Sequence, residues 1–136
     1  MPTNHKTNQE GVVRNVIEEW AAAVRARDFA GILRHHSPEI VMFDVPPPLQ
    51  SKGLDAYRKT WDLFFSWAHE PVVFDIVEMS VTCDDEVAFA AAVMRCSGTE
   101  TSGEDIDLEF RLTVGLRRID SQWTVVHEHH SIPATQ

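Results

Sequence analysis

The second half of the chain contains four apolar segments that follow one another with only polar turns or a short loop between them. They run from Val72 to Thr82, from Val87 to Ser97, from Ile106 to Arg118 and from Trp123 to Pro133. The third alternates apolar and polar residues, which is the two-residue period of a strand with one buried face. Because strands joined by short turns pair antiparallel, this half predicts a mostly antiparallel sheet. In the second segment, the alanine-rich run from Ala88 to Met94 indicates burial on both faces.

The first half of the chain predicts three helices and one strand. From Glu10 to Arg27, apolar residues recur at three- and four-residue spacing, the pattern of an amphipathic helix. Asp28 is expected to cap a short second helix that ends near His35-His36, where imidazoles complement the helix dipole. A strand from Ile40 to Val45 ends at three prolines, and a third helix runs from Leu54 to Ala68. Helices that precede an antiparallel sheet are typical of the α+β class.

The chain of 136 residues is predicted to form one domain spanning residues 1–136, with a flexible tail at residues 1–9. Its net charge of -9 argues against nucleic acid and anionic membrane surfaces as partners, because both attract positive charge. No apolar run approaches the ~20 residues that span a bilayer, and the polar segment 1–9 lacks the apolar core of a signal peptide. We therefore expect a cytoplasmic protein in which Cys83 and Cys96 are reduced, buried thiols.

The last predicted strand places ionisable residues at four consecutive positions, from His127 to His130. Because side chains alternate along a strand, His127 and His129 are expected on the buried face that Trp123 begins. Glu128 and His130 are expected on the opposite face, toward solvent or a polar dimer seam. Imidazole titrates near neutral pH, so the inward pair can serve as a proton shuttle or a base. The alternative is that both histidines only hold the sheet together through hydrogen bonds.

Three stretches of the chain carry a resemblance to a known family: Phe43 to Leu49, Arg111 to Arg117 and Trp123 to Pro133. With the order of elements, they make the chain similar to the SnoaL-like, ketosteroid isomerase-related branch of the nuclear transport factor 2-like superfamily. The resemblance implies a cone-shaped α+β fold, with N-terminal helices packed on a curved, mostly antiparallel sheet. It also implies a pocket between sheet and helices and, commonly, a homodimer formed through the sheet. The superfamily hosts many activities, so the resemblance specifies a fold rather than a reaction.

Asp44 is the candidate catalytic base, with His129 and His127 as partner acids or orienting donors. It follows an apolar strand and precedes a rigid proline segment, which fixes a carboxylate at the mouth of the implied pocket. The alternative is a turn residue that bonds the backbone near the prolines. In ketosteroid isomerases an Asp acts beside a Tyr and a protonated Asp. Here the only tyrosine, Tyr57, lies on the third predicted helix, which argues against steroid isomerisation.

Four further residues are candidates for substrate binding: Trp20, Trp61, Phe65 and Arg111. The aromatic residues lie at helical spacing, for which core packing is the default role, but a fold with a pocket uses the same residues to line it. Arg111 is a long cation on an apolar strand. It can bind a substrate carboxylate or pair with an acidic residue across the sheet.

Together these residues predict a protein that binds a small organic molecule, uncharged or weakly anionic, in an apolar pocket. Its catalytic form is a cofactor-free isomerase, dehydratase or cyclase that acts by proton transfer, since the sequence has neither a phosphate loop nor a dinucleotide fingerprint. One alternative is a non-catalytic ligand-binding or dimeric association module. Another is a metal-dependent variant in which His127, His129 and Asp44 hold zinc or iron, but the sequence has no established metal motif and we expect no metal.

Overall fold

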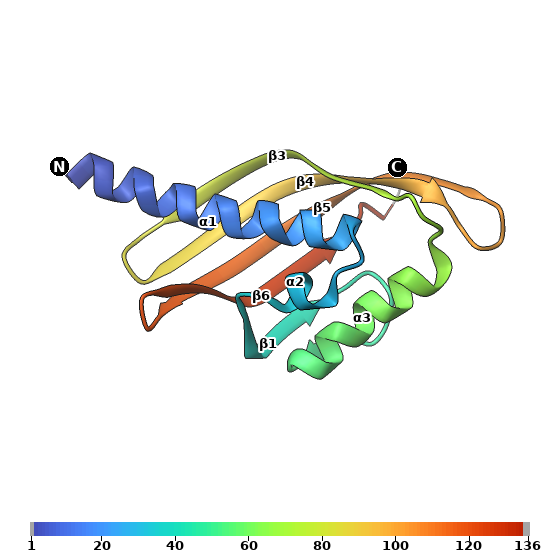
Figure 1. Ribbon diagram of the computed structural model, residues 1–136, viewed down its shortest axis with the longest axis horizontal. Coiled ribbons are helices and arrows are strands. Elements are labelled where there is room, and N and C mark those ends of the chain that lie inside the picture. The colour runs from blue at the N-terminus through green and yellow to red at the C-terminus, as the bar shows by residue number, and fades with distance from the viewer. Residues whose placement is uncertain (1, 135–136) are drawn as a thin grey trace.

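The computed structural model describes the backbone of residues 2–134 and the side chains of residues 8–134. In chain order, the elements are α1 (Pro2–Arg25), α2 (Phe29–Leu33), β1 (His36–Phe43), β2 (Ser51–Lys52), α3 (Leu54–Trp67), β3 (Val73–Cys83), β4 (Val87–Thr99), β5 (Asp105–Ile119) and β6 (Gln122–Ser131). The strands form one curved, six-stranded sheet, and the helices lie on one side of it (Figure 1). The predicted α+β class is therefore confirmed.

The strand order in the sheet is β2-β1-β6-β5-β4-β3. β1 runs parallel to β6, and the other neighbouring strands pair antiparallel, as predicted for most of the sheet. β2 is too short to give a sequence pattern and was not predicted. Because β1 and β6 are neighbours, the segment that precedes the prolines lies beside the terminal strand.

The hydrophobic core lies between the helices and the face of the sheet that they cover, which we call the inner face. Its members include Val13, Ile17, Trp20 and Val24 of α1, Tyr57 and Trp61 of α3, and Phe110, Leu112, Val114 and Leu116 of β5. The β5 residues are the alternating apolar positions predicted from the sequence. The predicted burial of both faces of β4 is wrong, because α1, α2 and α3 all lie on the inner face: Ala88 and Ala90 are buried, whereas Phe89 is 50 % exposed on the outer face.

Three local predictions in the first half need correction. α1 begins at Pro2 rather than near Glu10, so the segment predicted as a flexible tail is helical from Pro2 onward. Asp28 stands at the N-cap of α2 but makes no side-chain capping hydrogen bond. His36 is the first residue of β1 rather than the end of a helix, because α2 ends at Leu33: Arg34 (ψ 140°) and His35 (φ 63°) both have non-helical backbones.

β6 carries one more residue than the stretch of β5 that it pairs with. Gly115 pairs with His127, and the next residue, Leu116, pairs with Val125, so Val126 is the extra residue. This is a β-bulge, which places two successive side chains on one side of the strand and shifts the alternation by one position.

The bulge overturns the predicted orientation of the terminal histidines. Val125, before the bulge, is buried as expected. After it, Glu128 and His130 are the buried residues, whereas His127 is partly buried and His129 is exposed. For His127 to His130, the observed faces are therefore the opposite of those predicted from the sequence: Glu128 and His130 lie on the inner face, and His127 and His129 on the outer face.

Cys83 and Cys96 are both buried, as predicted. Among residues 2–134, no helix combines the length and the apolar character needed to cross a membrane.

Candidate active site

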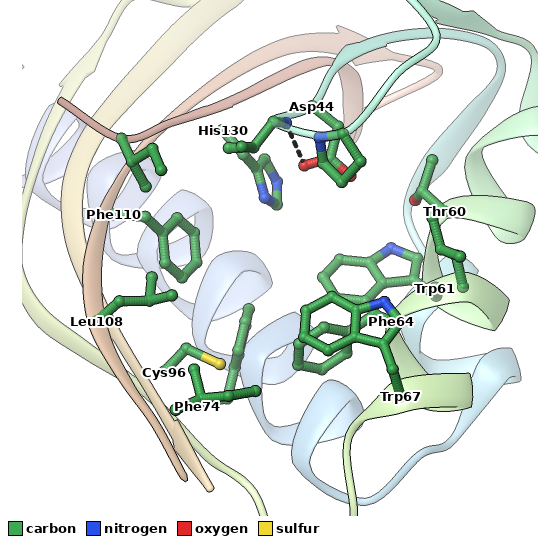
Figure 2. Close-up of a pocket in the computed structure, with 15 residues that line it drawn as sticks. Asp44, Thr60, Trp61, Phe64, Trp67, Phe74, Cys96, Leu108, Phe110 and His130 are labelled. Atoms are coloured by element: carbon green, nitrogen blue, oxygen red, sulfur yellow. Dashed lines mark hydrogen bonds between the residues drawn. The ribbon is translucent and has the colours of Figure 1, made fainter. Parts of the chain in front are cut away.

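A cavity of about 180 Å³ lies between α3 and the inner face of β3 to β6 (Figure 2). Its walls are mostly aromatic and aliphatic, formed by Trp61, Leu63, Phe64 and Trp67 of α3 and by Phe74, Ile106, Leu108 and Phe110 of the sheet. The ionisable or hydroxyl-bearing residues on the wall, apart from the Cys96 thiol, are Asp44, Thr60 and His130. An apolar protein cavity of about 150 Å³ holds benzene, so this cavity has room for one ring rather than for a fused-ring steroid.

His130 is the imidazole that reaches the cavity. Its ring stacks on Phe110 (centroids 5.5 Å apart, planes at 18°) and meets the edge of Trp61 (6.0 Å). Nε2 lies 3.0 Å from Glu128 Oε1. Within residues 8–134, Nδ1 has no hydrogen-bond partner, and Figure 2 shows the ring directed into the cavity.

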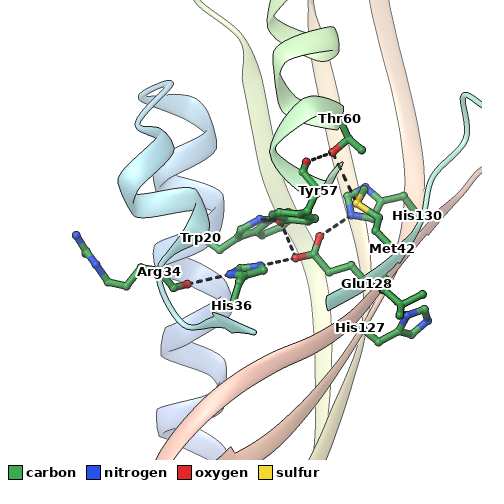
Figure 3. A network of polar contacts seen from close by, with 10 residues as sticks. Trp20, Arg34, His36, Met42, Tyr57, Thr60, His127, Glu128 and His130 are labelled. Carbon is green, nitrogen blue, oxygen red and sulfur yellow. Dashed lines mark hydrogen bonds and ion pairs between the residues drawn. The ribbon is translucent and has the colours of Figure 1, made fainter. Parts of the chain in front are cut away.

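Glu128 is the centre of a buried polar network behind His130 (Figure 3). It is 1 % exposed. Its Oε2 accepts a hydrogen bond from the Tyr57 hydroxyl (2.7 Å) and lies 2.6 Å from His36 Nε2. Tyr57 in turn accepts a hydrogen bond from Trp20 Nε1 (2.9 Å). These contacts replace the hydrogen bonds that the carboxylate would make with water, and they offset the free-energy cost of burying it.

The pKa of Glu128 is lowered, because the effect of its hydrogen-bond partners exceeds the effect of burial. Burial alone raises the pKa, but hydrogen bonds from His130 and His36 and attraction to both imidazoles lower the pKa of the carboxyl to about 2. Burial, followed by the charge of this carboxylate, raises the pKa of Tyr57 well above its usual value of 10.0, against a smaller opposing effect of nearby indole N–H groups. Glu128 is therefore ionised and Tyr57 neutral at physiological pH.

The hydrogen bonds of the two inner histidines indicate where their protons lie. His36 Nδ1 is 2.9 Å from the Arg34 carbonyl oxygen, which only accepts, so Nδ1 carries a proton. His36 Nε2 lies 2.6 Å from Glu128 Oε2, so the two side chains have the geometry of a buried ion pair. His130 likewise donates Nε2–H to Glu128, so in its neutral form Nδ1 has a free lone pair facing the cavity. A base oriented by a buried carboxylate is a recurring arrangement in acid–base catalysis.

Asp44 lies beside His130 because of the parallel pairing of β1 and β6. Met42 pairs with Glu128 and Phe43 pairs with His129. Extending this register by one residue sets Asp44 next to His130, on chains about 5 Å apart. Both residues line the cavity (Figure 2).

The environment of Asp44 supports both roles that the sequence suggested for it. Its Oδ1 accepts a hydrogen bond from the Val45 backbone N–H (2.8 Å), which is the turn role. The side chain is only partly buried, and it also lines a second hollow of about 260 Å³ beside the proline segment.

His127 and His129 do not join Asp44 at the cavity. Both lie on the outer face of the sheet, where their rings contact the edge or face of Phe43 (4.8 and 5.3 Å between centroids). His127 Nδ1 is 2.7 Å from the Val41 carbonyl oxygen. Their predicted place in the pocket is wrong, because the bulge at Val126 turns both residues outward. Their contacts instead match the alternative, in which they support the sheet.

The predicted substrate-binding residues are also mostly elsewhere. Trp61 lines the cavity. Trp20 is buried behind it, and Phe65 packs against Phe29 (5.6 Å between centroids) rather than facing the cavity. Arg111 is exposed on the outer face, where its Nε donates to Ser131 Oγ (3.1 Å).

The sequence reasoning missed the three residues of the network that are central here, Glu128, His130 and His36. One signal was present: Ile132 is an apolar residue on the same strand parity as Glu128 and His130, and it lines the cavity. No comparable pattern marks His36, whose partner lies at the opposite end of the chain.

The described part of the chain contains no cluster of three or more His, Cys, Asp or Glu side chains arranged to hold a metal ion. In particular, Asp44 lies at the cavity while His127 and His129 lie on the outer face. Cys96 lines the cavity, and burial raises the pKa of its thiol to about 11, so it stays protonated and weakly nucleophilic.

Comparison with known proteins places the fold in a family. Residues 13–135 match the model of the SnoaL-like domain. The chain belongs to the SnoaL-like family. A crystal structure of a nuclear transport factor 2-like protein of unknown function from Pseudomonas putida KT2440 is 37% identical to this SnoaL-like chain, with a TM-score of 0.85. That match covers 93% of this chain and 88% of the other.

More distant structures share the fold alone. A ketosteroid isomerase-like protein from Erwinia carotovora atroseptica has 15% identity and a TM-score of 0.78, over 90% of this SnoaL-like chain and 95% of its own. The association domain of Caenorhabditis elegans CaMKII has 17% identity and a TM-score of 0.76, over 95% and 99% of the two chains. No protein of curated function matches the chain.

Proposed function

We propose that this protein binds an uncharged, single-ring molecule in the cavity beneath α3 and moves a proton to or from it. The observation that carries the proposal is the position of His130, where a buried, charge-balanced network reaches an otherwise apolar cavity. The walls supply apolar contact area, and the few polar groups fix the orientation of the ligand, which is how small-molecule sites are generally built.

In this proposal His130 is the base and Asp44 is the second proton-transfer group. Nδ1 of His130 accepts a proton from the ligand, and the electrons of the broken bond remain on the ligand. The proton then returns to another ligand atom in an isomerisation, or leaves with a hydroxyl group as water in a dehydration. Glu128 is a positioning residue, since it holds the Nε2–H tautomer and stabilises the imidazolium that forms. No step requires a cofactor.

The binding part of the proposal is tested with toluene, which matches the size and apolar character of the cavity. We expect toluene to shift the backbone NMR signals of residues around the cavity, and a Leu108→Trp variant, which fills the space, to lose this response. Thr101→Trp, on an exposed loop, is the control and should retain it. If toluene causes no saturable shift in the folded protein, the cavity is not a binding site.

The proton-transfer part is tested by the tautomer of His130. Long-range ¹H–¹⁵N NMR at pH 8 should show Nε2 protonated and Nδ1 unprotonated. For any substrate converted at this site, His130→Asn should lower kcat by about 10²- to 10⁴-fold, the usual contribution of a general base. His129→Asn is the matched control, because it makes the same change on the same strand but on the outer face. A protonated Nδ1 at pH 8, or equal losses in the two variants, argues against His130 as the base.

A second candidate function, self-association through the sheet, is favoured by the outer face of β4. On this face the side chains of Val87 and Phe89 are 55 % and 50 % exposed, and Ala91 of the same strand is exposed as well. β4 pairs with β3 on one side and with β5 on the other. A sheet face in contact with water usually carries polar residues, so neighbouring apolar side chains suit a protein partner. A second copy of the chain is the partner we propose, giving a homodimer.

Light scattering coupled to gel filtration tests the homodimer. The wild-type protein should have twice the 15.4 kDa mass of the chain. Phe89→Glu should give the monomer mass, because it places a charge in the proposed interface, whereas Thr101→Glu adds the same charge on a loop and should leave the mass unchanged. A wild-type monomer at high protein concentration contradicts the dimer but leaves the cavity proposal standing.

A further inference from the structure

The polar end of the cavity presents hydrogen-bond acceptors. Asp44 contributes a carboxylate, which when ionised only accepts. Neutral His130 contributes the lone pair of Nδ1, because its N–H is used on Glu128. Thr60 donates its hydroxyl proton to the Tyr57 carbonyl oxygen (2.7 Å), so it too can offer the cavity only its oxygen lone pairs.

The hydrogen-bond donors of the cavity wall are few. Trp61 and Trp67 line its α3 side (Figure 2), and the Trp61 ring also lies against His130 (6.0 Å between centroids). Trp61 Nε1 is fully enclosed and makes no hydrogen bond within the described residues, so it is sealed off from a ligand in this arrangement. Cys96 contributes an S–H, which is a weak donor. The Val45 backbone N–H, next to Asp44, is already taken by the Asp44 carboxylate.

A ligand must therefore match two or three neighbouring acceptors at one end of an apolar, ring-sized space. A carbonyl or carboxylate oxygen directed at this end meets lone pairs and a negative charge, and it loses its hydrogen bonds to water without replacement. A hydroxyl group supplies the missing donor. The apolar walls disfavour a ligand that carries a charge.

We infer that the ligand is a neutral, single-ring compound whose hydroxyl group donates a hydrogen bond to Asp44 or His130. This inference rests on the proposed binding function of the cavity and specifies its ligand class.

Two probes of nearly equal size test the inference. Benzyl alcohol has a hydroxyl donor, whereas benzaldehyde has the same heavy atoms and only an acceptor. At pH 8, NMR titration should give an affinity for benzyl alcohol about tenfold higher than for benzaldehyde, corresponding to one hydrogen bond to a charged or strongly basic group. Toluene serves as the reference without a polar group. Trp67→Phe removes the donor on the α3 side and should maintain or widen the preference.

Variants identify which acceptor is responsible. Asp44→Asn introduces an amide donor at nearly constant size, so it should reduce the preference to about threefold or less by improving benzaldehyde binding. His130→Phe keeps a ring that can stack on Phe110 but removes the lone pair, so it should weaken the binding of benzyl alcohol more than that of toluene. His129→Phe is the control on the outer face and should alter neither affinity.

The outcomes separate this inference from the proposed function. If toluene, benzyl alcohol and benzaldehyde all fail to bind the folded wild-type protein, the binding function itself is wrong. If toluene binds but benzaldehyde binds as tightly as benzyl alcohol, or if neither Asp44→Asn nor His130→Phe changes the ratio, the cavity is a binding site and the hydroxyl preference for these acceptors is wrong.

Discussion

Both faces of β6 carry histidines, but the histidine on the inner face is buried beside a carboxylate, whereas those on the outer face lie at the surface. On the inner face, His130 stacks on Phe110 and bonds a carboxylate that is 1 % exposed. On the outer face, His129 is exposed and His127 bonds a backbone carbonyl oxygen. Residue type alone does not distinguish these histidines. The difference is set by one extra residue, Val126, which decides the side of the sheet on which each imidazole lies.

The comparison teaches that a histidine becomes useful for chemistry through its partners. His130 has one nitrogen fixed by Glu128 and the other directed into an apolar space, and Glu128 itself is also held by residues from two other elements, His36 of β1 and Tyr57 of α3. The outer histidines lack a carboxylate partner among the described residues, and they lie against Phe43 at the surface. Substitutions on the two faces of β6 and in the network around Glu128 therefore test this contrast.

Replacing Glu128 by Gln should be the most damaging conservative change in the chain. It removes the charge that balances His36, and it presents an amide whose NH₂ cannot accept the bonds that a carboxylate oxygen accepts. Breaking one side of a buried ion pair typically costs about 3–5 kcal/mol, and we expect a loss of this size in urea unfolding. The matched control is Glu109→Gln, an exposed position on the outer face of β5, which should change stability by less than about 0.5 kcal/mol. Similar losses in both variants contradict a special role for the inner face.

Acid should weaken the inner network over a defined range of pH. The pKa of Glu128 is about 2 in the folded protein, below its usual value of 4.5, so its contribution to stability is complete above about pH 5 and is lost as the pH falls toward 2. The full contribution is of the order of 3 kcal/mol, since one pKa unit is equivalent to about 1.4 kcal/mol. Urea midpoints measured between pH 6 and pH 3 should fall more steeply for wild type and Glu109→Gln than for Glu128→Gln. Parallel curves for all three proteins are the contrary result.

Most of the fold follows from local patterns. The alternation in β5, the helical spacing of α1 and α3, and the chain-stopping prolines after β1 each depend on residues close in sequence, and the observed elements match those predictions. The start of α1 does not match its prediction, because the first turns of the helix lack an apolar stripe of their own. A tertiary hydrogen bond, from Trp123 Nε1 to Gln9 Oε1 (2.6 Å), holds the helix where the sequence pattern ends.

The candidate site is less accessible to sequence reasoning, because it depends on register. Asp44 was identified from its place between an apolar strand and the prolines, and it does line the cavity. Its expected partner was shifted by one residue, from His129 to His130, because a bulge is a property of two paired strands and not of one segment. His36 and Glu128 meet across 92 positions of sequence, a contact that no local periodicity indicates.

The smallest effects should come from the outer histidines, and their order distinguishes the two assignments of the faces. Substituting Asn for His127 removes the hydrogen bond to the Val41 carbonyl oxygen (2.7 Å) and should cost about 1 kcal/mol. His129→Asn, at an exposed position, should stay within about 0.5 kcal/mol. The same substitution at His130 deprives a buried carboxylate of a donor and should cost about 1–3 kcal/mol.

Urea unfolding of these three variants at pH 7 gives the ranking directly. Regular alternation from Trp123 onward, without the bulge, requires the opposite order, with His127 and His129 both costlier to replace than His130. The ranking His130, then His127, then His129 is therefore a consequence of the single extra residue at Val126, and any other order removes the basis for assigning the inner face its chemistry.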